Sequence, residues 1–333
     1  MTVTDGGGPA YEGTKTGGSG STTRAGTTRV VADAAALLVV PAVLLAVFTL
    51  PESTKRAAAF SYTEPTFLTA FTAHYVHLTV PHLVGNVVGF ALLASVAYGL
   101  SLLAGRRRLF FAAATTFLLA FPFVLSGLNL AVPRNAIGYG FSGVNMAFFG
   151  YIAVILPVAV DEGFGVAWRR YAPGVFFVSI AYIALIALPL SVVSAGVGVA
   201  SIVFALPYGR EAVRDRAETR ERAAARDRAG ARGDGRSDGD GRSDGDDRSD
   251  GSEPPRVTVR RILSRPGYGE LLAVAVVVLL AYPFIGFPTV STTGPRVNVY
   301  VHFLGYALAF IVVHVSLLAD RDATTWRDLS GAP

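Results

Sequence analysis

The chain contains no cysteine, which excludes disulfide bridges, thiolate nucleophiles and cysteine-ligated metal sites. Acidic residues are scarce outside one stretch, because 13 of the 24 lie between Glu211 and Glu253. The first 29 residues are rich in Gly, Thr and Ser and lack the apolar core of a cleavable signal peptide, so we expect a disordered tail there. The net charge of +5 does not indicate nucleic acid as a partner, since most arginines flank apolar runs in the positive-inside pattern.

Long apolar runs with almost no charge make up most of the remaining sequence, and 52% of all residues are hydrophobic. A helix needs about 20 residues to cross the hydrocarbon core of a bilayer, and these runs are about that long or longer. The sequence therefore predicts an all-α, polytopic bundle of transmembrane helices in the cell membrane, with the lipid bilayer as a partner. The expected apolar runs are Val31–Leu50, Leu78–Ala104, Leu109–Val132, Ser142–Val160, Pro173–Pro207, Glu270–Val290 and Val297–Ala319.

The stretch 173–207 is too long for one crossing and has two interpretations. As a single helix it would be about 52 Å long at 1.5 Å per residue. As a hairpin it would turn near Pro189–Gly196, where proline, serine and glycine occur close together. The stretch by itself does not decide between them.

A low-complexity segment, 208–265, separates this stretch from the last two spans. It begins with Glu211–Arg228, whose Arg, Glu and Ala residues are compatible with a charged helix, and continues with two GRSDGD hexamers at 235–246. Such a composition cannot bury a core, so we expect a disordered charged linker. A regulatory or partner-binding segment is the alternative.

Three of the five histidines lie near the start of the second span, as His74, His77 and His82. His82 and Asn86 are one helical turn apart and share a face, whereas His77 points elsewhere, toward the preceding loop. Polar side chains at this depth are costly unless they line a cavity or find partners. The face with His82 and Asn86 therefore predicts a polar site inside the membrane.

The fourth span opens with the motif Gly140-Phe141-Ser142-Gly143. A serine at a helix start is most often only an N-cap. Here the flanking glycines allow close backbone approach and leave the hydroxyl accessible, and a backbone N–H at this helix end could stabilise an oxyanion. The motif alone is compatible with either interpretation.

The last span contains His302, with Gly305 and Ala309 after it. The spacing of the two small residues lets another helix pack closely against this one. Alone, His302 is as compatible with a buried core histidine as with a functional one. An ionisable group inside a membrane nevertheless indicates a functional site by default.

The three motifs together resemble those of one family. HxxxxHxxxN ending at Asn86, GxSG at 140–143 and HxxG starting at His302 are similar, in this order, to the motif set of the rhomboid intramembrane serine proteases. The resemblance covers about 31–319 and leaves out both tails and the linker. It implies a rhomboid-like six-helix core, here with an extra hairpin, and cleavage of transmembrane protein substrates.

The family's roles can be carried over by position. Ser142 would be the nucleophile and His302 its base, while His82, the Asn86 side chain and the Ser142 backbone N–H would hold the oxyanion. No Asp or Glu lies in the spans near the serine or the histidine, which indicates a dyad rather than a triad. No cofactor or metal is expected, because the chain has no HExxH pattern and Asn86 is a poor ligand.

Other positions would support this site. Gly140 and Gly143 would lie beside the oxyanion and the substrate, and His77, Met146 and Gly305 would have supporting roles. Met146 stands where family members usually have a tyrosine stacked beneath the catalytic histidine, although a thioether can also pack against an imidazole. The family's Trp-Arg pair is absent from the first outer loop, which affects the membrane contacts of that loop rather than the chemistry.

The proposed dyad also constrains the topology. Ser142 and His302 each lie near the N-terminal end of their span, so they can meet only if both spans run in the same direction. An odd number of crossings must then separate them. Because the run 270–290 supplies one crossing, the stretch 173–207 must supply two crossings or none. We therefore expect the hairpin, and about eight spans in total.

The distribution of arginine predicts the orientation, with both termini and the linker in the cytoplasm and the dyad toward the outer face. The expected organisation is a tail (1–29), a first membrane part containing Ser142 (30–207), the linker (208–265), a second membrane part containing His302 (266–319) and a tail (320–333).

Two other functions are compatible with the sequence. A rhomboid-like protein without activity would bind transmembrane clients, but such relatives typically lack the serine or the histidine, and this chain has both. A transporter or metal site would use the histidines. The sequence predicts neither the identity of the substrate nor the oligomeric state.

Overall fold

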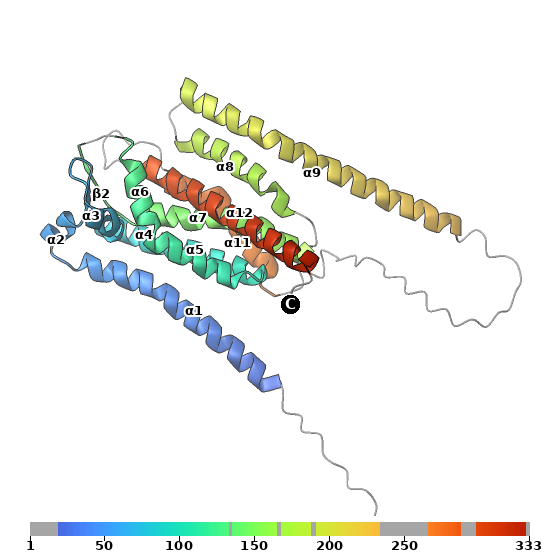
Figure 1. Cartoon of the computed structure of the whole chain (residues 1–333), viewed down its shortest axis with the longest axis horizontal. Coiled ribbons are helices and arrows are strands. Elements are labelled where there is room, and N and C mark those ends of the chain that lie inside the picture. Colours follow the sequence, from blue (N-terminus) through green and yellow to red (C-terminus); the bar gives the residue numbers. More distant parts are fainter. Residues whose placement is uncertain are drawn as a thin grey trace, which may run out of the picture.

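The computed structural model describes residues 19–132, 135–164, 168–187, 191–233, 266–287 and 298–330. This part of the chain is mostly helical and includes one small two-stranded sheet. Its elements are α1 (Ser19–Phe48), α2 (Glu52–Ala57), β1 (Phe60–Ser61), α3 (Phe67–Thr72), η1 (Ala73–Tyr75), α4 (Val80–Leu103), α5 (Arg107–Leu119), α6 (Phe121–Asn129), β2 (Ile137–Gly138), α7 (Ser142–Phe164), η2 (Trp168–Tyr171), α8 (Ala172–Ala187), α9 (Val192–Gly233), α11 (Tyr268–Gly286) and α12 (Val299–Ser330) (Figure 1).

The length and apolarity of these helices confirm the predicted all-α polytopic bundle. Within the described residues, seven helical segments are long and apolar enough to cross a membrane. Helices α5 and α6 together would form an eighth span, bent by 46° at the break between them. Pro122 lies in the first turn of α6, where a ring without an N–H is tolerated at a helix start but interrupts a continuous helix.

The stretch 173–207 forms two helices, as the hairpin interpretation requires. Helix α8 ends at Ala187 and α9 begins at Val192, and the two helices lie side by side (Figure 1). Residues 188–190, which belong to the predicted turn, lie outside the described residues. The hairpin supplies two crossings between the fourth span and the last two.

Helix α9 continues well past the apolar stretch and is 42 residues long. The linker boundary expected at 208 therefore falls inside a helix, and the charged segment Glu211–Arg228 is part of it. Arg, Glu and Ala all have high helix propensity, which favours this continuation. Arg170 of η2 forms ion pairs with Glu211 and Asp215 that tie the extension to the bundle. The GRSDGD hexamers lie outside the described residues.

Helix α7 lies at the centre of the bundle, where 89% of its spanning window is buried, and it packs against α12 and α4. A Cβ added to Gly305 of α12 would overlap the carbonyl oxygen of Gly143, and one added to Gly150 would lie 3.2 Å from Ala309 Cβ. The small residues thus bring α7 and α12 into close contact. Gly143 contacts Gly305, and Gly150, further along α7, contacts Ala309, further along α12. The residue numbers therefore increase in the same direction on both helices, so α7 and α12 run parallel.

The segment between α1 and α4 folds over the end of the bundle at which α7 begins. Strand β1 pairs antiparallel with β2, with Phe60 opposite Gly138 and Ser61 opposite Ile137. A capping box at Thr66 and Thr69 starts α3. Since β2 leads directly into α7, this small sheet holds the backbone that approaches Ser142.

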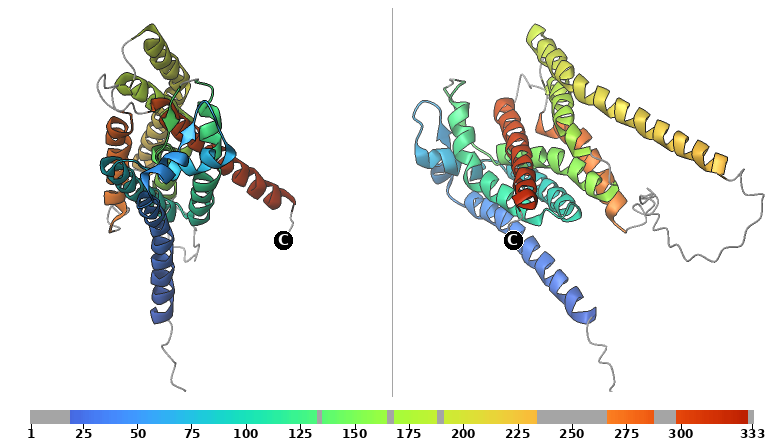
Figure 2. Two further views of the ribbon diagram at one scale, coloured as in Figure 1. Left: turned by 90° about the vertical axis from the view of Figure 1, so that its left-hand side faces the viewer. Right: turned by 45° about the vertical axis from the view of Figure 1, so that its right-hand side comes forward.

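Helix α1 is peripheral, and only 17% of its spanning window is buried (Figure 2). One buried carboxylate ties it to the rest of the protein. Asp33 accepts hydrogen bonds from the Tyr98 hydroxyl and the Arg107 Nε, both at 2.6 Å. A buried carboxylate is stable only when it is paired in this way.

Candidate active site

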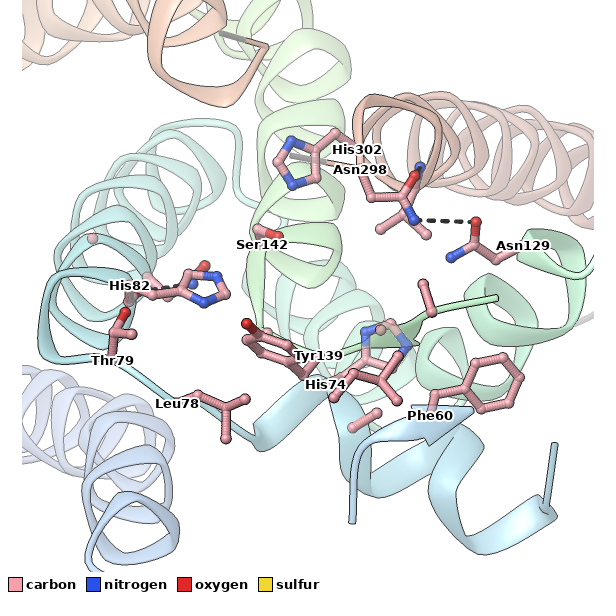
Figure 3. Close-up of a pocket in the computed structure, with 18 of the residues that line it drawn as sticks. Phe60, His74, Leu78, Thr79, His82, Asn129, Tyr139, Ser142, Asn298 and His302 are labelled. Atoms are coloured by element: carbon pink, nitrogen blue, oxygen red, sulfur yellow. Dashed lines mark hydrogen bonds between the residues drawn. The ribbon is translucent and has the colours of Figure 1, made fainter. Parts of the chain in front are cut away.

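A cavity of about 1150 Å³ lies where α7 and α12 begin (Figure 3). Its walls come from the segment before α4 and from α4, α6, β2, α7, α11 and α12. Of the residues predicted to form the site, six line this cavity: His82, Asn86, Gly140, Ser142, Met146 and His302. The other three, His77, Gly143 and Gly305, do not line it but contact residues that do, namely His82, Val301 and Met146.

Ser142 is the first residue of α7, and Gly140 shapes the backbone before it. Gly140 has a φ of +112°, a conformation that residues with a side chain rarely adopt. Its N–H donates to the carbonyl oxygen of Ala73 at 2.9 Å, which fixes this turn to η1. The Ser142 hydroxyl therefore stands at a helix N-terminus, where free N–H groups and the helix dipole favour negative charge.

His302 lies in the first turn of α12 and is 5% exposed. Its Nδ1 forms a short hydrogen bond with the backbone carbonyl oxygen of Gly286, at the end of α11. Because a carbonyl oxygen can only accept, Nδ1 must be the donor. In the neutral ring Nε2 is then the nitrogen that can accept a proton. The carbonyl thus holds the imidazole in the position where a triad has a carboxylate.

Two further residues pack around His302 and the carbonyl group that binds it. The Phe287 ring meets the imidazole edge to face, with the ring centroids 6.0 Å apart. Met146 packs against the backbone that binds the histidine, since a Cβ added to Gly286 would lie 2.9 Å from the Met146 sulfur. The orientation of His302 therefore depends on the end of α11, which carries none of the three motifs.

Ser142 and His302 come from different helices and face the same cavity (Figure 3). Among the described residues no hydrogen bond joins the two side chains. In unliganded enzymes the hydrogen bonds used in catalysis are often long or poorly aligned, and they tighten in the complex with substrate. The structure thus brings the two groups to one site, with Nε2 free to accept a proton.

The His82 ring packs against the backbone just before Ser142. A Cβ added to Gly140 would lie 2.7 Å from His82 Nε2, so only glycine leaves room for the ring there. The centroids of the His82 and Tyr139 rings are 5.7 Å apart. His82 is thereby placed beside Ser142, as expected for a residue that would contact the oxyanion.

Asn86 lies one turn further along α4 and is 5% exposed. Its Nδ2 donates to the backbone carbonyl oxygen of His82 at 3.0 Å, which leaves one amide hydrogen for another acceptor. Asn145 of α7 donates to both the backbone oxygen and the side-chain oxygen of Asn86, at 3.0 and 3.2 Å. Asn145 lies outside the three motifs, although a lone amide in an apolar span is a detectable signal in the sequence.

His77 lies next to the cavity without lining it, and its side chain is completely buried. Its Nε2 accepts a hydrogen bond from the Phe141 N–H at 3.4 Å, and its ring meets that of His82 with centroids 4.9 Å apart. Burial, with a smaller effect from neighbouring His82, lowers the pKa of His77 to about 4. The ring is therefore neutral at physiological pH, as an acceptor must be.

A second buried histidine, His74, also lies on the loop side of the cavity. It shares a hydrogen bond with the Ser126 hydroxyl at 3.1 Å, and that hydroxyl donates to Ala70 O at 2.8 Å. Burial lowers the pKa of His74 to about 4. The sequence pattern gave this histidine no role, and the structure makes it part of the link between α3, η1 and α6.

Asn298 fixes the start of α12 next to the cavity. Its side-chain oxygen accepts from the Val301 N–H at 3.3 Å, and its Nδ2 donates to Asn129 Oδ1 at 3.2 Å. Asn129 in turn donates to the Tyr62 hydroxyl at 2.7 Å. An asparagine just before an apolar run is a typical N-cap, so this signal was present in the sequence.

A scan against models of protein families, a search of curated proteins and a search of solved structures found no match to this chain. The function therefore has to be argued from the site. The site combines a hydroxyl at a helix N-terminus, an imidazole whose Nδ1 is bound to a carbonyl, and polar groups on the facing helix. These are the components that acyl transfer needs: a nucleophile, a base and donors for a developing oxyanion.

Proposed function

We propose that this protein is a rhomboid-type intramembrane serine endopeptidase that cleaves transmembrane protein substrates with a Ser142–His302 dyad. The observation that best supports this is the shared cavity, which holds both residues although 160 positions separate them in the sequence. The parallel packing of α7 and α12 at their glycines supports the same proposal, because it brings both helix starts to one level.

The reaction would proceed through an acyl-enzyme. Ser142 Oγ forms a bond to the substrate carbonyl carbon while its proton passes to His302 Nε2. The carbon–nitrogen bond then breaks, and His302 returns the proton to the leaving amine. Water, with the same histidine as base, hydrolyses the ester and restores the serine.

The oxyanion would be held by the Ser142 backbone N–H, by His82 and by the free amide hydrogen of Asn86. The first belongs to a helix N-terminus, and the other two lie on α4 across the cavity. Donors fixed before the reaction stabilise the transition state without reorganisation.

The chemistry also limits the substrate. An intact transmembrane helix hides its carbonyl groups in its own hydrogen bonds, so the substrate must be locally unwound to reach Ser142. Helix-breaking residues near the cleaved bond would favour this. We place the cavity toward the outer face, with both termini in the cytoplasm, because the positive-inside pattern favours that orientation.

A serine-directed probe tests this proposal. A fluorophosphonate should label the wild type, and neither Ser142→Ala nor His302→Ala should be labelled, because the serine is nucleophilic only with its base. Equal labelling of wild type and Ser142→Ala would overturn it.

One observation favours a second function, a catalytically inactive rhomboid-like protein that binds transmembrane clients. Ser142 and His302 face the same cavity, but within the described structure no hydrogen bond joins them. A wild type that binds a transmembrane segment but neither reacts with the probe nor cleaves would support this function.

A further inference from the structure

Asn145 is a buried polar residue in the most deeply buried helix of the bundle. It lies three residues after Ser142 on α7 and is 2% exposed. A buried amide is costly unless its hydrogen bonds are made, and in a membrane no water is at hand to make them. The helix could hold an apolar residue of the same size here, so the position of the amide calls for an explanation.

Asn145 and the His82 carbonyl oxygen together fix how the Asn86 carboxamide is oriented. The backbone oxygen of Asn86 can only accept, so the Asn145 atom that lies 3.0 Å from it must be the amide nitrogen. That same nitrogen is 3.2 Å from one atom of the Asn86 carboxamide, which must then be the oxygen. The Asn86 nitrogen consequently points the other way, toward the His82 carbonyl oxygen at 3.0 Å.

This orientation matters because Asn86 lines the cavity. If its carboxamide were turned over, an oxygen would face the His82 carbonyl and the site would lose a donor. Gly89, one turn further along α4, leaves room for the arrangement, since a Cβ there would lie 3.1 Å from Asn145 Nδ2. Asn145 does not line the cavity. Within the described residues, its side-chain hydrogen bonds both go to Asn86, which does.

We propose that Asn145 is a positioning residue that holds the Asn86 carboxamide with its N–H group toward the oxyanion. This inference rests on the proposed function. It assigns a role to a residue outside the three motifs. A residue of α7, the helix that begins with Ser142, would then orient a hydrogen-bond donor on α4.

A double-mutant cycle tests the coupling, with cleavage of a model transmembrane substrate by wild type, Asn86→Ala, Asn145→Leu and the double variant. Removing an oxyanion donor typically lowers kcat by about 10²-fold, so we expect that for Asn86→Ala and at least about tenfold for Asn145→Leu. KM should change little, because the donor acts in the transition state. The double variant should be no slower than Asn86→Ala, because Asn145 acts only through Asn86.

A matched control separates positioning from general stability. Ser101 of α4 and Tyr151 of α7 also share a buried hydrogen bond between the same two helices, at 2.8 Å and away from the cavity. Ser101→Ala should lower the unfolding temperature and leave kcat unchanged. Asn145→Ala is a second variant, should the larger leucine prevent folding.

The outcomes are distinct. A kcat for Asn145→Leu and Asn145→Ala within twofold of wild type, or losses that multiply in the double variant, would overturn this inference alone. A wild type that cuts no faster than Ser142→Ala would overturn the proposed function and this inference with it.

Discussion

Gly305→Ala perturbs the contact that brings the two proposed catalytic residues together. The added Cβ would overlap the carbonyl oxygen of Gly143 and lie 3.2 Å from Met146 Cβ. Neither neighbour is the far end of a flexible side chain, so α12 must move away from α7. His302 is one turn before Gly305 on the same helix and must move with it, while Ser142 stays at the start of α7.

The expected effect has two parts. Overpacking a close contact costs about 1–3 kcal/mol of stability. A shift of about 1 Å between reacting groups can lower the rate about 10²-fold. We therefore expect kcat for a model transmembrane substrate to fall about 10²-fold, with KM nearly unchanged and a folded protein in detergent.

The control is Gly198→Ala on α9, where an added Cβ has nothing within 4 Å. It should have wild-type kcat. A Gly305→Ala protein with wild-type kcat would show that the α7–α12 contact does not set the geometry of the site.

Three further predictions address stability and topology. His74 and His77 have their pKa lowered from 6.5 to about 4 by burial, so the unfolded chain takes up protons first as the pH falls. The free energy of unfolding in detergent should therefore decrease between about pH 6.5 and 4, by about 3 kcal/mol for each histidine, and a flat profile would contradict their burial. Asp33→Asn weakens the tie between α1 and the bundle and should lower the free energy of unfolding by about 1–3 kcal/mol without changing kcat, since Asp33 lies outside the cavity. Because the chain has no cysteine, single cysteines can map its topology. An impermeant thiol reagent added outside should label Thr63→Cys but not Ser237→Cys, and the reverse result would contradict the proposed orientation.

Much of the fold follows from hydropathy and from one geometric requirement. The apolar runs predict the spans, and the need for Ser142 and His302 to meet predicts that the stretch 173–207 is a hairpin, which the structure confirms. The extent of α9 was harder to predict, because its charged half has both high helix propensity and the composition of a disordered linker. Ion pairs from Arg170, a residue distant in the sequence, favour the helix.

The site was only partly predictable, for a physical reason. Side chains with distinctive chemistry, such as His82 and His302, leave a signal in the sequence. The group that binds His302 is the backbone carbonyl of Gly286, and every residue has such a carbonyl, so no residue pattern indicates it. Asn145 was visible as a polar residue in an apolar span, but its partner on α4 becomes apparent only when the helices are packed.

Proteolysis by this protein is tested most simply by the rate at which the purified protein, reconstituted in lipid vesicles, cleaves a model transmembrane substrate. We expect cleavage by the wild type and none detectable with either Ser142→Ala or His302→Ala, because the proposed nucleophile and its base act as a unit. Cleavage by both variants at the wild-type rate would contradict it.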